Sequence, residues 1–381
     1  MPTFTINLIE ILVLFGAGQG LILAYILVST KRFRKKSNYF LALLLFTLGI
    51  LNFTSIFEYS PNRDTLELFR YIPTFWVTMI PAATYFFIKY LISPTYQWKK
   101  TDWLFFVPFF IEFGHRLYRF GRFLNGNLYT EEENLRYYFM SNIYESVAII
   151  ASITVIVYSV KALKRYEVQL YQNYSEVEDK SLKWLRTTLM SGLLLCALWG
   201  FLTIMYFDFN SSYRLLALVL LLGLSILIYY TGYSMIIRQD LLDTSVFAVA
   251  NKDAKVELAE SSNITELSHK TDEHFRKIKE LFEQEKLYQD PSLNMSMLSD
   301  KTGLSNGYLS QIINQKNNLN FFDFVNSYRV EDVKKKMSEP DYEHYTLLGL
   351  AQEAGFKSKS TFNSVFKKMT GKTPSEYRKS L

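Results

Sequence analysis

Cysteine and histidine are scarce in this chain of 381 residues. Cys196 is the single cysteine, which excludes an internal disulfide and a cysteine-rich zinc site. None of the four histidines has another histidine three or four residues away, which excludes a zincin-type helix. Because no nucleophile–base pair or metal cluster is evident either, we expect no catalytic site, no bound metal and no cofactor.

Long hydrophobic runs are what the chain has in abundance, and they are concentrated in its first two thirds. Hydrophobic residues make up 49% of the chain and aromatic residues 17%. Roughly 20 apolar residues, each adding 1.5 Å of helix, are needed to cross a bilayer. Seven runs approach or reach that length. They predict a seven-helix transmembrane bundle with spans at 7–29, 38–57, 71–92, 103–119, 140–160, 186–207 and 214–236.

A basic cluster at 31–36, Lys-Arg-Phe-Arg-Lys-Lys, predicts the orientation of the bundle. It follows the first apolar run, whereas the basic residues of a cleaved signal peptide come first. Loops rich in Lys and Arg stay in the cytoplasm, so the N-terminus is expected outside. With the N-terminus outside, a cytoplasmic C-terminus requires an odd number of spans. We therefore count the fourth run as a span, although Glu112, His115 and Arg116 interrupt it. We expect a multi-pass protein of the bacterial inner membrane.

Three acidic residues are candidates for a ligand site in the membrane half. Glu145 lies inside the fifth run, and an ionisable group within a span is costly and often functional. Glu112 and Glu58 lie near the ends of their runs, where acids usually mark the water boundary. The predicted outer loops are short except for roughly 120–139. A signal would therefore bind within the helices or in that loop, or would be a lipid or a membrane partner protein.

Beyond the membrane half, residues 239–270 are polar and are predicted to be a flexible cytoplasmic linker. From about 271 the hydrophobic residues return with helical spacing. A helix over 295–301 is expected to end at Gly303. The hydroxyl of Ser305 is then suited to cap a second helix over 306–314, because it can accept a hydrogen bond from a free backbone N–H. These two helices form a predicted first helix-turn-helix unit.

A second unit of the same size follows, joined to the first by a predicted helix over 321–337. Thr346 is expected to cap a helix over 347–354. Gly355 makes the turn, and Ser358 opens a helix that continues to 369. The chain as a whole is therefore predicted to be all-α, with a helical C-terminal domain over 271–381.

The residues of this domain follow a recognisable order over about a hundred positions: Leu298, Gly303, Leu304, Ser305, Tyr308, Leu309, Ser310, Tyr328, Arg329, Ala351, Ala354, Gly355, Phe356, Ser360, Phe362, Phe366, Lys367, Lys368, Gly371, Pro374, Tyr377 and Arg378. In this order the segment resembles the AraC/XylS-type DNA-binding domain. The resemblance implies sequence-specific transcription regulation, with double-stranded DNA and RNA polymerase as partners. Asn318 stands where the family usually has glycine, but asparagine tolerates the left-handed conformation. Gly307 inside the first recognition helix weakens that helix by about 1 kcal/mol relative to alanine.

The N-terminal residues of a recognition helix reach base edges. Base-reading candidates are therefore Asn306, Tyr308 and Gln311 in the first unit and Lys357, Lys359, Ser360, Thr361 and Asn363 in the second. Asn and Gln pair with adenine, and Lys pairs with guanine. Candidates for phosphate contacts are Ser305, Thr346, Lys367, Lys368 and Lys372.

We interpret the chain as a membrane-anchored transcriptional regulator that senses a signal through its membrane half. One alternative is a transporter or receptor whose helix-turn-helix tail only autoregulates its own gene. A transporter would be expected to carry paired intramembrane charges or broken helices in repeated halves. Here one candidate charge and no convincing repeat are found. Another alternative is a helix-turn-helix that makes protein contacts only. The signal, the operator, activation versus repression and homodimer formation are left open.

Overall fold

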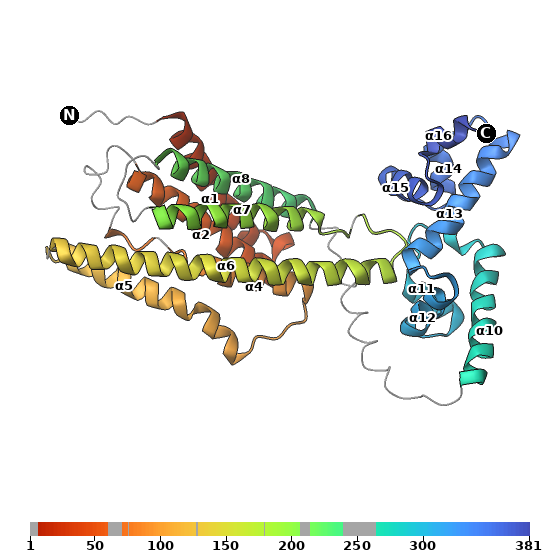
Figure 1. Cartoon of the computed structure of the whole chain (residues 1–381), viewed down its shortest axis with the longest axis horizontal. Helices are drawn as coiled ribbons and strands as arrows, with labels where there is room; N and C mark the ends of the chain where they lie inside the picture. The colour runs from red at the N-terminus through yellow and green to blue at the C-terminus, as the bar shows by residue number, and fades with distance from the viewer. Residues whose placement is uncertain are drawn as a thin grey trace. The chain divides into compact units, whose positions relative to one another are not determined.

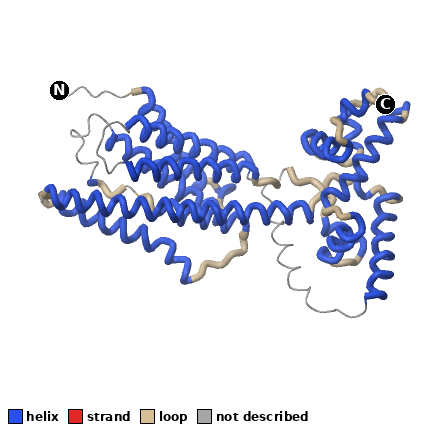
Figure 2. The backbone as a smooth tube through the Cα atoms, in the orientation of Figure 1, coloured by secondary structure: helices blue, strands red, loops and turns tan. Residues whose placement is uncertain are grey.

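The structure is a computed structural model that describes residues 7–59, 71–74, 76–126, 129–178, 180–205, 214–238 and 264–381. The described residues form helices and loops, and no strand occurs among them (Figures 1 and 2). This confirms the predicted all-α fold. The chain divides into two compact units. One comprises Met1–Leu163 with Leu182–Asp240, and the other comprises Lys164–Ser181 with Leu241–Leu381.

The first unit is the apolar one. Its helices are α1 (Leu8–Ser29), α2 (Lys36–Tyr59), α4 (Met79–Ile92), α5 (Val107–Leu124), α6 (Glu131–Asn173), α7 (Lys183–Met205) and α8 (Arg214–Arg238). The last part of α6, from Lys164 onward, belongs to the second unit. By length and composition, five of these, α1, α2, α6, α7 and α8, could cross a membrane. Each of the five overlaps one of the predicted spans.

The third and fourth predicted spans look different in the structure. The third was expected over 71–92, but α4 begins only at Met79 and has 14 residues. Pro73 lies in the irregular stretch before it, and a proline restricts the residue that precedes it and donates no backbone hydrogen bond. The fourth, α5, is amphipathic. It buries the charged side chains of Glu112, Arg116 and Arg119.

Small and polar residues bring the apolar helices together. A Cβ atom on Gly20 of α1 would lie 3.0 Å from the carbonyl oxygen of Leu45 on α2, so the two backbones are close. The Nδ2 of Asn52 on α2 donates to the Oγ of Ser225 on α8 at 3.0 Å. Close backbone approach and interhelical hydrogen bonds are the means by which helices associate in lipid. The packing of this unit is therefore consistent with a membrane environment.

The second unit contains the predicted C-terminal domain. Its helices are α10 (Ile264–Glu283), α11 (Met295–Thr302), α12 (Asn306–Asn317), α13 (Phe321–Ser338), α14 (Leu347–Glu353), α15 (Lys359–Thr370) and α16 (Pro374–Lys379). The N-terminal end of α10 falls within the predicted linker 239–270, while residues 239–263 lie outside the described residues. Within this unit α13 runs from the α11–α12 pair to the α14–α15 pair (Figure 1).

Local signals set the ends of these helices. The hydroxyls of Ser305, Thr346 and Ser358 each accept a backbone N–H from the first turn of the helix that follows. Asn318 ends α12 with a positive φ of 54°, so the asparagine does adopt the left-handed conformation that the sequence required. Gly355 has φ 95°, and a Cβ there would lie 2.6 Å from the carbonyl oxygen of Tyr288. Only glycine fits this turn.

Candidate DNA-binding interface

Two helix-turn-helix units are present, and each has its own apolar contacts. In the first, α11 and α12 pack through Leu298, Leu309 and Ile312, which are fully buried. In the second, Phe356 of the turn packs against Phe362 of α15 with ring centroids 5.3 Å apart. Burial of these side chains fixes the angle between the two helices of each unit. It leaves the start of α12 and the start of α15 as the two candidate reading ends.

Arg329 of α13 ties the domain together from its interior. Its side chain is fully buried. Its Nε donates to the carbonyl oxygen of Tyr288 and its Nη2 to that of Asp290, both at 2.8 Å. Burial lowers the pKa of Arg329 to about 10, which still leaves it charged at neutral pH. The guanidinium therefore holds the 288–290 turn against the linking helix, and its role is structural.

The base-reading candidates of the second helix-turn-helix unit lie in or beside the first two turns of α15. Lys357, Lys359, Ser360 and Asn363 are exposed. Thr361 is only 6% exposed. Its hydroxyl donates to a carboxylate of a neighbouring loop instead of facing solvent.

The candidates of the first helix-turn-helix unit, at the start of α12, differ from one another in exposure. Gln311 is exposed, whereas Asn306 is half-buried and its Oδ1 has no hydrogen-bond partner among the described residues. The hydroxyl of Tyr308 lies 3.2 Å from Nδ1 of His274, which ties this ring to α10. Of these three side chains, Gln311 is the one that faces solvent most openly.

The phosphate candidates divide into caps and lysines. Ser305 and Thr346 already accept a backbone N–H, from Tyr308 at 3.3 Å and from Gly349 at 3.0 Å. Lys367 is exposed, and Lys372 Nζ donates to the Ser380 hydroxyl at 3.2 Å. Lys368 lies 2.7 Å from a carboxylate oxygen of Asp323. A phosphate would have to compete with that carboxylate.

Two acidic residues that the sequence analysis did not single out lie against the start of α15. Glu176 accepts hydrogen bonds from the Thr361 hydroxyl at 2.6 Å and from the Lys357 N–H at 3.4 Å. Glu178 accepts from the hydroxyls of Ser358 and Ser360. A signal was present in the sequence, since the acidic run Glu-Val-Glu-Asp at 176–179 lies in the connection between the fifth and sixth predicted spans.

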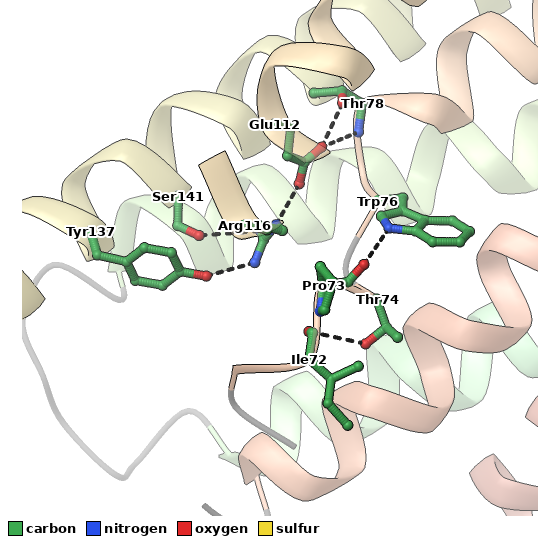
Figure 3. A network of polar contacts seen from close by, with 9 residues as sticks. All are labelled: Ile72, Pro73, Thr74, Trp76, Thr78, Glu112, Arg116, Tyr137 and Ser141. Carbon is green, nitrogen blue, oxygen red and sulfur yellow. Dashed lines mark hydrogen bonds and ion pairs between the residues drawn. The ribbon is translucent and has the colours of Figure 1, made fainter. Parts of the chain in front are cut away.

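One of the membrane-half candidates, Glu112, belongs to a buried polar network in the first compact unit (Figure 3). Glu112 is fully buried and accepts from the Thr78 N–H at 3.1 Å and from Arg116 Nε at 3.1 Å. Arg116 also donates to the Tyr137 hydroxyl at 2.7 Å and to the Ser141 hydroxyl at 3.3 Å, which joins α5 to α6.

Glu145 is the candidate on α6 itself. It accepts from Trp199 Nε1 of α7 at 3.1 Å and from the Thr203 hydroxyl at 3.2 Å. It also contributes to the electrostatic environment of Arg116, the guanidinium that donates to Glu112. The side chain of Glu58 lies outside the described residues.

Comparisons with known proteins identify the C-terminal part. The sequence model of a family described as a helix-turn-helix domain matches residues 298–380. An uncharacterised HTH-type transcriptional regulator of Staphylococcus aureus strain COL is 29% identical over 102 residues, which cover 27% of this chain and 13% of that relative. A probable transcription factor of Proteus vulgaris, PqrA, is 26% identical over 92 residues, which cover 24% of this chain and 73% of that relative. No solved structure gives a significant match.

The C-terminal part of the chain is thus an AraC-type helix-turn-helix domain. This confirms the resemblance inferred from the order of its residues. The chain spans about an eighth of the length of the S. aureus relatives, 13%, so the match concerns the domain and not the whole protein.

Proposed function

We propose that the protein is a membrane-anchored, sequence-specific transcriptional regulator that binds double-stranded DNA. The observation that carries this proposal is the joining of two features in one chain. An AraC-type helix-turn-helix domain exposes Lys357, Lys359 and Asn363 beside its second recognition helix. Within its described residues, the same chain contains five helices long and apolar enough to cross a membrane. On this proposal the protein is not an enzyme, and RNA polymerase and a second copy of the chain are its further partners.

The proposed location is the bacterial inner membrane, with the N-terminus outside and the C-terminal domain in the cytoplasm. The basic cluster 31–36 directly after α1 supports this orientation. The bacterial origin of the two relatives named above supports the type of cell. A phosphatase reporter is active only outside the cytoplasm. Fused after Arg238 it should be inactive, whereas an active fusion at this position would refute the topology.

The membrane unit is proposed to receive the signal, through a ligand or a membrane partner. The polar network of the buried Glu112 and Arg116 and the half-buried Glu145 supports this role. Ionisable side chains within a membrane span cost free energy and often have a functional role. The network also joins α5, α6 and α7, so a ligand that competes for one of these charges would alter contacts among three helices.

Genome-wide DNA capture with the full-length protein in nanodiscs tests the proposal. Discrete enriched sites that share a sequence motif, and footprints over those sites, are the expected result. A chain with Lys357, Lys359 and Asn363 all changed to alanine is the control and should lose the sites. Capture without enrichment by the full-length protein, in the presence and absence of membrane extract, would refute DNA binding.

A further inference from the structure

The loop between α6 and α7 is built into the C-terminal unit. Ser175 is fully buried, and its N–H donates to the carbonyl oxygen of Leu293 at 3.3 Å. The carbonyl oxygen of Ser175 accepts from Asn326 Nδ2 at 3.2 Å, and its hydroxyl oxygen accepts from Arg329 Nη2 at 3.2 Å. The Val177 side chain is also buried. Specific backbone and side-chain contacts therefore hold this loop, residues 174–181, on the domain.

Docked in this way, the loop places two carboxylates on the end of α15 that would read DNA. Glu176 and Glu178 bind the hydroxyls of Ser358, Ser360 and Thr361, the cap and first turn of the helix. Glu176 also accepts the backbone N–H of Lys357. Free N–H groups and the helix dipole favour an anion at this position. A DNA phosphate, or a base edge presented to α15, would need the same groups and the same space.

We propose that the 174–181 loop is an autoinhibitory segment, in which Glu176 and Glu178 occupy the DNA-reading end of α15 and compete with DNA for it. This inference rests on the proposed DNA-binding function. The apparent association constant for DNA is then the intrinsic association constant multiplied by the fraction of molecules in which the loop is undocked. The loop is a competitor tethered in the same chain, so its effective concentration at α15 is high.

The tether also supplies a route for the signal. Along the chain the loop follows α6, which ends at Asn173, and leads into α7, which begins at Lys183. A displacement of either helix would therefore be transmitted to the loop through the chain itself. Burial raises the pKa of Glu176, so its charged form is held on the domain at a cost that favours release.

The first experiment measures DNA affinity of full-length protein in nanodiscs, with a captured genomic fragment as the probe. The variant Glu176→Ala/Glu178→Ala removes both carboxylates from α15. The matched control, Glu167→Ala/Glu273→Ala, removes two carboxylates from elsewhere in the same unit, on α6 and α10. We expect the first variant to bind about tenfold more tightly than the control, which corresponds to a loop that is docked in about nine of ten molecules. Equal affinity of the two variants would overturn the proposal.

Hydrogen–deuterium exchange of the unmodified full-length protein tests the competition itself. On addition of the fragment, amides at 357–363 should become protected while amides at 174–181 exchange faster. Continued protection of 174–181 in the DNA complex would overturn autoinhibition and leave DNA binding intact. If no fragment is captured by the wild type or by either variant, the proposed function fails instead, and the inference fails with it.

Discussion

The two helix-turn-helix units share one architecture but differ at the end that would meet DNA. At the start of α12, the Ser305 hydroxyl caps the helix and Tyr308 contacts α10. At the start of α15, the Ser358 hydroxyl caps the helix and two carboxylates from a distant loop cover it. The second reading end is the one that the rest of the chain can reach and occupy.

The units differ in charge as well. From 305 to 318 the first unit carries a single lysine, Lys316, and it pairs with Asp272. From 357 to 372 the second unit carries five lysines. Since lysines supply most of the attraction to phosphate, we attribute most of the DNA affinity to the second unit. Control by the acidic loop then acts where most of the binding energy lies.

The largest expected effect comes from removing the Arg329 guanidinium on α13, the helix that joins the two helix-turn-helix units. Arg329→Met leaves two carbonyl oxygens without their donor, that of the buried Tyr288 and that of the half-buried Asp290. Each unsatisfied buried acceptor costs about 1–3 kcal/mol, so the domain should lose about 3 kcal/mol or more of its free energy of unfolding. Urea unfolding of the full-length protein in detergent, followed by exchange at α13 amides, measures the loss.

Arg276→Met is the matched control, because Arg276 lies on the surface of α10 with an ion pair of 3.8 Å to Glu280. It should change the free energy of unfolding by less than about 0.5 kcal/mol. An Arg329→Met domain as stable as this control would mean that the guanidinium is dispensable for holding the two units on one linking helix.

The second prediction tests whether α15 reads bases. Lys359→Ala should cost about 1–3 kcal/mol of binding free energy at one base position if Lys359 contacts a guanine. Affinities for a set of single-base variants of the captured site measure this. Lys335→Ala on α13 is the control and should leave base preference unchanged. A loss that is uniform over all bases, with a shallower salt dependence, would make Lys359 a phosphate contact.

The caps and turns of both units were predictable because they depend on neighbouring residues. The Ser305, Thr346 and Ser358 caps and the left-handed Asn318 each involve a side chain within a few positions of the backbone it serves. The spacing of apolar residues likewise predicted most helices. The first recognition helix begins where predicted, at Asn306, and ends three residues later than predicted, at Asn317 instead of Asn314.

The contacts at the reading end of α15 were not predictable in this way. Glu178 and Ser358 are 180 positions apart, and no local pattern links them. The shortening of the third span depends on where the chain becomes irregular around Pro73, which hydropathy alone does not show. The Glu112–Arg116 pair has helical i, i+4 spacing, but its partners Thr78 and Tyr137 come from other segments. Tertiary packing decided the contacts of Glu178 and those of the Glu112–Arg116 pair.

The third prediction concerns the first helix-turn-helix unit, whose recognition helix α12 is weakened by Gly307. Gly307→Ala should stabilise α12 by about 1 kcal/mol, because alanine loses less backbone entropy in a helix. The shift in melting temperature of the full-length protein measures the stability, and the affinity for the captured site measures the reading. If the variant is more stable but binds less tightly, then Gly307 is needed for close approach of α12 to DNA and the first unit reads more than its charge suggests.

The smallest expected effect is on pH dependence. In the docked loop Glu176 faces Glu178 on its own segment, Arg329 of α13 and the Lys357 N–H and Thr361 hydroxyl beside α15. Its pKa is raised by burial, so the docked state binds more protons than the undocked state between the ordinary carboxyl pKa and the raised value. Docking should therefore strengthen as pH falls from neutral toward the ordinary carboxyl pKa. The affinity ratio of Glu176→Ala/Glu178→Ala to Glu167→Ala/Glu273→Ala should rise over that range, and a ratio that falls instead would show that the charged form of Glu176 is the one that holds the loop on α15.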